Sequence, residues 1–152
     1  MLKSLIIVAV LSIAGTQTAA QSLVGKWDCD GRVDKTTSIK SLQQYRSNGN
    51  FYHLVNVAIG QSGERFDAAV AMRGIWTGKG AVLIEDIKSA RIRSVKRNGR
   101  DITKTPEGQF LAKTLRSSMI RPGRPSRITL DTLSANKMTF KDGRVAANCT
   151  RR

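Results

Sequence analysis

Residues 47–59, with the sequence SNGNFYHLVNVAI, join a turn to a strand and set the pattern that the rest of the chain repeats. Asn48-Gly49 is a strong signal for a tight hairpin turn. Between Phe51 and Ile59 both alternating faces are largely apolar, which predicts a strand that is covered on each side. His53, the single histidine of the chain, falls within this strand and is expected to be a packed or hydrogen-bonded core residue.

Short apolar segments separated by turn residues recur about every ten residues along the chain, which is typical of a β-sandwich or barrel. The expected strands are Lys26–Asp30, Thr36–Arg46, Phe51–Ile59, Arg65–Trp76, Ala81–Ile87, Ala90–Val95, Arg127–Leu133, Lys137–Lys141 and Arg144–Thr150.

A helix is predicted where this pattern is interrupted, after Thr105. Thr105 can cap the helix, Pro106 suits its first position, and Glu107 complements the helix dipole. Along this segment, Leu111, Leu115 and Met119 recur every four residues on one stripe. The sequence therefore predicts a mostly β fold: a small antiparallel barrel or sandwich of about eight strands with one short helix near residues 106–119.

The N-terminus has the three parts of a secretory signal peptide. A basic start with Lys3 is followed by an apolar run, Leu5–Ala14, and then by Thr18-Ala19-Ala20. The apolar run is too short to span a bilayer, which needs about 20 residues. We therefore expect residues 1–20 to be removed, and residues 21–152 to form one exported domain, periplasmic or secreted.

Two cysteines, Cys29 and Cys149, lie near the two ends of the expected domain. In an oxidising compartment an isolated pair usually forms a disulfide. A metal site or a nucleophilic cysteine is disfavoured because the chain has one histidine and no C-x-x-C motif. No metal and no cofactor are expected.

Three short motifs resemble those of bacterial lipocalin-like (calycin-type) small β-barrel domains. They are L-x-G-x-W at residues 23–27, Y-x-x-x-G-x-F at residues 45–51 and G-x-W at residues 74–76, within a match that covers about residues 22–84. The resemblance implies that Gly25 lets the chain cross the barrel floor and that Trp27 closes that end of the barrel. It also implies that an arginine of a late strand packs over the Trp27 ring. Arg144 or Arg151 could take this position, and the spacing does not decide between them.

The chain is strongly basic, with a net charge of +15. Residues 88–127 contain twelve basic and only two acidic residues, a balance that favours anionic partners. Arginine suits this role because its guanidinium can hold a carboxylate or phosphate through two hydrogen bonds. The candidate anion-binding residues are Arg91, Arg93, Lys96, Arg97 and Arg100.

The residue inventory argues against common enzyme classes, and we do not expect an enzyme. Ser–His–Asp and Cys–His chemistry needs a histidine beside a nucleophile, whereas His53 lies among apolar neighbours. Glu85 and Asp86 are adjacent and would point to opposite faces of a strand.

Two functions remain. One is an exported lipocalin-like binding protein that holds a small amphipathic or anionic ligand, or docks on anionic lipid or envelope polymer. The other is an interaction protein, an inhibitor or effector, that binds an acidic protein through its basic surface. Export argues against nucleic acid as the partner.

Overall fold

The computed structural model describes residues 22–152, so the predicted signal peptide lies outside the described residues. In chain order the elements are β1 (Gly25–Arg32), β2 (Thr37–Tyr45), β3 (Asn50–Gln61), β4 (Glu64–Lys79), β5 (Val82–Arg97), β6 (Arg100–Asp101), α2 (Pro106–Met119), β7 (Ser126–Leu133), β8 (Lys137–Asp142) and β9 (Val145–Arg151). Within this range no helix is long and apolar enough to cross a membrane.

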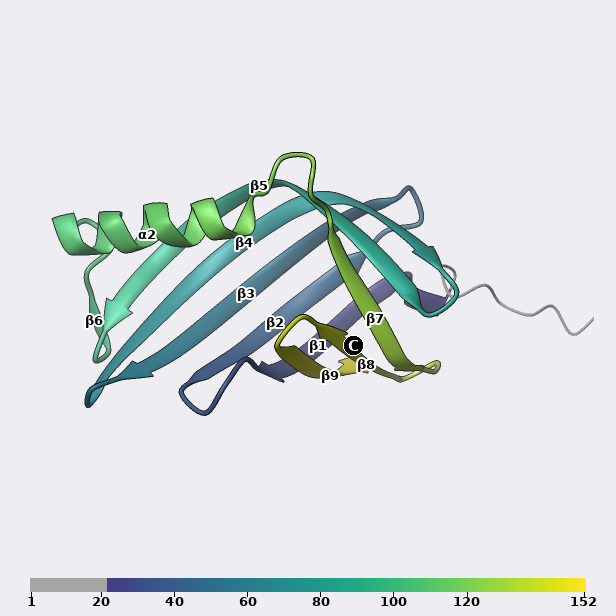
Figure 1. Ribbon diagram of the computed structural model, residues 1–152, viewed down its shortest axis with the longest axis horizontal. Coiled ribbons are helices and arrows are strands. Elements are labelled where there is room, and N and C mark those ends of the chain that lie inside the picture. The colour runs from purple at the N-terminus through teal and green to yellow at the C-terminus, as the bar shows by residue number, and fades with distance from the viewer. Residues whose placement is uncertain (1–21) are drawn as a thin grey trace, which may run out of the picture.

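The strands form one antiparallel sheet whose two ends meet (Figure 1). The sheet order is β4-β3-β2-β1-β9-β8-β7-β5-β6, and a further pairing of β4 with β5 closes a ring of eight strands among residues 22–152. The two-residue strand β6 pairs only with the end of β5. The predicted fold class, a mostly β antiparallel barrel or sandwich with one short helix, is confirmed.

The ring is asymmetric because its strands differ greatly in length. β4 and β5 have 16 residues each, whereas β8 has 6. β7 pairs with β5 only from Val82 to Glu85, so most of the long β5 continues beyond β7. Figure 1 shows this extension of β3, β4 and β5, with α2 lying along it.

The expected break between the strands 81–87 and 90–95 was wrong: a single strand, β5, runs from Val82 through both segments. The β4–β5 ladder shifts register twice, between Ala69 and Val70 and between Arg73 and Gly74. Each shift leaves one β5 residue, Lys88 or Arg93, without a direct partner in β4. Such bulges bend a strand without ending it, which is why the polar residues near position 88 do not form a turn.

Helix α2 occupies the predicted residues. The Thr105 side chain accepts a hydrogen bond from the Gly108 amide, as expected of an N-cap. Gly108 is the one residue of α2 that is fully buried. A Cβ there would overlap the Ile102 carbonyl, so the glycine that weakens the helix locally is required for close packing against the preceding loop.

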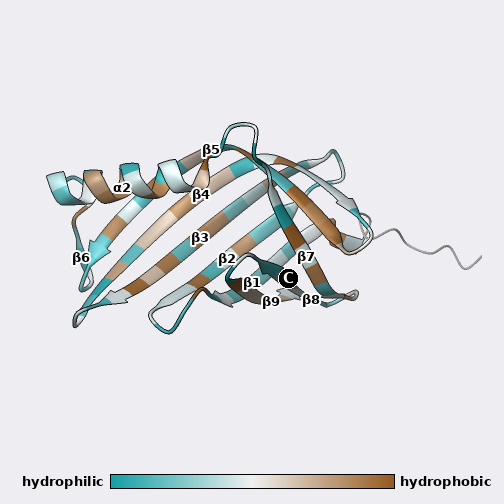
Figure 2. Cartoon of the chain, viewed as in Figure 1, coloured by the Kyte–Doolittle hydropathy of each residue, from teal (hydrophilic) through white to brown (hydrophobic). Residues whose placement is uncertain are grey.

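Alternating hydrophobic and hydrophilic residues along the long strands (Figure 2) place the apolar side chains inside the ring. The main core cluster includes Trp27, Tyr45, Phe51 and Trp76.

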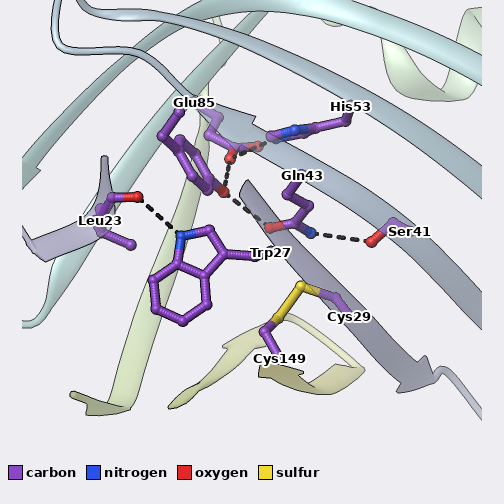
Figure 3. Close-up of a disulfide and its surroundings, with 9 residues drawn as sticks. Leu23, Trp27, Cys29, Ser41, Gln43, His53, Glu85 and Cys149 are labelled. Carbon is purple, nitrogen blue, oxygen red and sulfur yellow. Dashed lines mark hydrogen bonds and ion pairs between the residues drawn. A yellow bond between two sulfur atoms is a disulfide. The ribbon is translucent and has the colours of Figure 1, made fainter. Parts of the chain in front are cut away.

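Cys29 and Cys149 face each other across β1 and β9 and form the predicted disulfide. It joins the first strand of the ring to the last one (Figure 3).

Candidate anion-binding groove

A groove of about 1190 Å³ lies between helix α2 and the extended part of the sheet. It is lined by Tyr52, Ala71, Arg73, Ser89, Ala90, Arg91, Ile92, Arg93, Ala112, Lys113, Arg116, Ser117 and Ile120. Five of these, 89–93, are consecutive in β5. Since successive side chains of a strand point to opposite faces, both faces of β5 and the edge between them border the groove.

The groove exists because β5 has a free edge there. β7 pairs with β5 only up to Glu85, and β6 pairs only with Lys96 and Arg97. From Asp86 to Ser94, therefore, no described strand pairs with the outer edge of β5. Helix α2 packs beside this edge, and its lining side chains form the opposite wall of the groove.

The charged side chains that line the groove are all positive. They are Arg73, Arg91, Arg93, Lys113 and Arg116. All five are exposed, and among residues 22–152 none forms an ion pair or a side-chain hydrogen bond. Arg73 lies over the Tyr52 ring, with its guanidinium carbon 5.4 Å from the ring centroid. Converging like charges raise the local potential and attract anions, and a bound anion would relieve their mutual repulsion.

Apolar groups alternate with these charges. Ala71, Ile92, Ala112 and Ile120 contribute to the walls, together with the Tyr52 ring. Sites for small organic ligands combine apolar surface with placed polar or charged groups, and this groove has both, with the basic groups prominent. The arrangement suits a ligand that is anionic in part and apolar in part.

The structure separates the five basic residues predicted from the sequence into two groups. Arg91 and Arg93 line the groove. Lys96, Arg97 and Arg100 lie at the β5–β6 hairpin, outside the groove lining.

Arg97 is already paired within the protein. Its guanidinium contacts Glu64 and lies 3.4 Å from Glu107, which ties β4 and α2 to the end of β5. The hydrogen bond and charge of Glu64, with a contribution from Glu107, raise the pKa of Arg97. These contacts give Arg97 a structural role here.

Sequence reasoning did not single out Tyr52, Arg73, Lys113 or Arg116 as site residues. Arg73 comes from β4, far from the basic stretch in sequence, and only the β4–β5 register places it opposite Ser89. Lys113 and Arg116 are one turn apart on α2. Their i, i+3 spacing was the available signal, but it could not show which strand α2 lies beside.

The arginine over Trp27 is Arg151, with its guanidinium carbon 4.2 Å from the ring centroid. Arg144 lies outside the strands, between β8 and β9, and is exposed. The β1–β9 register decides this, because Trp27 is directly opposite Arg151. Gly25 has a positive φ of 139°, and the Arg151 guanidinium occupies the place of a Cβ.

Inside the ring, a buried polar network centres on Glu85 (Figure 3). The Glu85 carboxylate accepts a hydrogen bond from the Tyr45 hydroxyl (2.6 Å) and lies 3.1 Å from Nε2 of His53. His53 is only 2% exposed and stacks on Phe51, so it is a packed, hydrogen-bonded core residue as predicted. Asp86 points outward and pairs with Lys88 at the surface.

Burial by itself would raise the pKa of Glu85. The charge of His53 and the hydrogen bonds from His53 and Tyr45 outweigh burial and lower that pKa. Burial, followed by the charge of Glu85 and its hydrogen bond, raises the pKa of Tyr45 well above its usual value. The network therefore holds an ionised carboxylate inside the ring.

No group of three or more His, Cys, Asp or Glu side chains in the described part of the chain is placed to hold a metal ion.

The sequence matches no known protein-family model, and no curated protein is significantly similar to it.

Proposed function

We propose that this protein is an exported, lipocalin-like binding protein that holds a small amphipathic anion in the groove between α2 and β5. The observation that carries the proposal is the set of five basic groove side chains, unpaired among residues 22–152 and without an acidic residue in the lining. Simple solubilising charge requires no such convergence, because solvated lysines and arginines can spread over a surface.

Two further features support the lipocalin-like assignment. The strands of the ring follow one another in chain order, as in up-and-down barrels. Arg151 lies over Trp27 beside Gly25, which is the arrangement that the resemblance implies. The disulfide is consistent with an oxidising compartment, and we propose that export follows cleavage after Ala20.

The binding site can be tested with anilinonaphthalene sulfonate, a fluorescent probe that carries one sulfonate on apolar rings. We expect it to bind the protein, with an affinity that falls as salt is added, because exposed charges are screened over about 10 Å at 0.1 M. The double variant Arg91→Gln/Arg93→Gln should bind about tenfold or more weakly, since a hydrogen bond to a charged group contributes about 1.5–3 kcal/mol. Its thermal midpoint should barely change, because both residues are exposed.

The pair Lys96→Gln/Arg100→Gln is a matched control. It removes the same amount of charge from the same basic stretch of the sequence, but its residues lie outside the groove lining. Its affinity for the probe should remain close to that of the wild type. Equal losses in both variants would show that binding depends on overall charge, and the proposed groove would be wrong.

One observation favours the alternative, an interaction protein that binds an acidic partner. Phe110, in α2, is 69% exposed, and an exposed aromatic residue beside basic residues is common in protein interfaces. This face lies on the same helix as Lys113, so both functions would use α2.

A further inference from the structure

A second pocket, of about 490 Å³, adjoins the groove. Tyr52 and Arg73 line both cavities, so the two share a common wall. The additional residues of the second pocket come from the β2–β3 hairpin and β4: Gln44, Arg46, Asn50, Phe51 and Gly74. We call these two adjoining cavities, which together extend from α2 past Tyr52 to this hairpin, the track.

The chemistry of the second pocket differs from that of the groove. It offers two side-chain amides, Gln44 and Asn50, which have no hydrogen-bond partner among the residues described. Arg46 is exposed, and its guanidinium is also unpaired there. Arg73 lies over the Tyr52 ring, and Gly74 contributes only its backbone to the lining because it has no side chain. A Cβ at Gly74 would overlap the Asp86 carbonyl, so a larger residue is not accommodated.

Each of these groups suits part of a sugar. An amide both donates and accepts hydrogen bonds, as recognition of a hydroxyl group requires. A guanidinium holds a carboxylate in a two-pronged contact, and the flat face of an aromatic ring covers the apolar face of a pyranose. A simple polyanion needs the arginines but has no use for the two amides.

We propose that the track binds an acidic oligosaccharide, with sugar carboxylates in the groove on Arg91 and Arg93 and a further sugar on Tyr52, Arg46 and the two amides. This inference rests on the proposed function, because it extends the same groove. It adds a second subsite and extends the ligand from a small anion in the groove to an oligosaccharide whose anionic sugar occupies that same groove. Charge complementarity supports it, since neither cavity is lined by an acidic residue.

The experiment compares four ligands by calorimetry on the wild-type protein. Hexagalacturonate carries both carboxylates and hydroxyls, galacturonate is its single unit, maltohexaose is neutral, and hexaglutamate is acidic without sugar hydroxyls. Hexagalacturonate should bind at least about tenfold more tightly than galacturonate, because it fills both subsites, and maltohexaose should not bind measurably. A hexamer that binds no more tightly than the monomer, or a bound maltohexaose, would overturn the proposal.

Two variants locate the second subsite. Arg46→Gln should lower the affinity for hexagalacturonate about tenfold, which is the effect of losing one charged hydrogen bond. The double variant Gln44→Ala/Asn50→Ala should weaken hexagalacturonate but leave hexaglutamate unchanged. Arg144→Gln is the control, since it removes one exposed charge away from the track, and it should match the wild type. Thermal midpoints of all variants establish that they fold.

The outcomes distinguish failure of the oligosaccharide proposal from failure of the proposed anion-binding groove. If both subsite variants bound hexagalacturonate as tightly as the wild type does, the proposal of an acidic oligosaccharide would be refuted. If the affinity for anilinonaphthalene sulfonate still depended on Arg91 and Arg93 in that case, the proposal of an anion-binding groove would be retained. Equal loss of hexaglutamate and hexagalacturonate in the amide variant would also refute sugar recognition. Failure of the wild type to bind both anilinonaphthalene sulfonate and hexagalacturonate would refute both proposals.

Discussion

At the scale of single residues, Trp27 of β1 and Arg151 of β9 connect the first and last strands of the chain. The indole of Trp27 is fully buried, donates to the Leu23 carbonyl and lies under Arg151. Arg151 also donates to backbone carbonyls of Ser22 and Val24. One side chain thus satisfies two carbonyls of the segment that leads into β1 and covers an aromatic face. Lysine could not do the same, because its single ammonium lacks the planar fork.

Glu85 provides a prediction at the same scale. Its folded pKa is lowered, so the stability that it contributes is present above its unfolded pKa near 4.5 and is lost as pH falls through the folded value. The wild type should therefore lose stability on acidification, as the pH falls below about 4.5. Glu85→Gln should be less stable at neutral pH by about 1–3 kcal/mol and should show a weaker acid dependence. Urea midpoints across this pH range measure both.

Asp86→Asn is the control for Glu85, because Asp86 is the adjacent carboxylate and pairs with Lys88 at the surface. Surface ion pairs contribute little, about 0–1 kcal/mol, so the acid dependence should remain that of the wild type. An unchanged acid dependence in Glu85→Gln would mean that other carboxylates determine the response to pH.

At the scale of elements, α2 matters because it forms one wall of the groove. Its position depends on the contact of Gly108 with the Ile102 carbonyl and on Arg97, which reaches Glu107. The stripe of Leu111, Leu115 and Met119 is only half-buried. Few buried apolar contacts are typical of elements that open at low free-energy cost, so the close contact at Gly108 is important for the position of the helix.

The substitution Gly108→Ala tests this dependence. In an isolated helix it would stabilise by about 1 kcal/mol, but here the new Cβ would overlap a backbone carbonyl. We expect a destabilisation of about 1–3 kcal/mol, as for overpacking, together with weaker binding of anilinonaphthalene sulfonate. Thermal unfolding and a fluorescence titration measure the two effects. Gln109→Ala, at the exposed neighbouring position, should change neither, and a more stable Gly108→Ala protein would contradict the packing argument.

At the scale of the whole molecule, the disulfide links the first and last strands of the chain, β1 and β9, covalently. Cys29 and Cys149 are 120 residues apart in sequence but directly opposite in the ladder. Closing so long a loop restricts the unfolded chain, which in the chain-entropy model is equivalent to about 4–5 kcal/mol. The bond therefore stabilises the pairing of β1 with β9, the first and last strands of the chain, within the ring.

The double variant Cys29→Ser/Cys149→Ser should lose about 4–5 kcal/mol of unfolding free energy, measured by urea unfolding. The wild type unfolded under reducing conditions should behave similarly.

The intact mass of protein exported to an oxidising compartment should correspond to a chain that begins at Gln21 with both cysteines oxidised. Titratable thiols in that protein, or an unchanged urea midpoint in the variant, would contradict the assignment.

The sequence by itself determined the features that depend on local patterns. Alternation and turns predicted most strands, Thr105-Pro106-Glu107 predicted the start of α2, and the isolated cysteine pair predicted the disulfide. These signals are local because side-chain direction, capping and turn conformation depend on near neighbours in the chain.

Only the tertiary structure decided how distant segments meet. Strand register placed Arg151 rather than Arg144 on Trp27, and the two β5 bulges joined two expected strands into one. The groove arose in the same way: Arg73 of β4 and Lys113 of α2 meet Arg91 only because the short β7 leaves the edge of β5 free. Register and strand length result from packing across the whole sheet, and a one-residue shift would move every side chain to the opposite face.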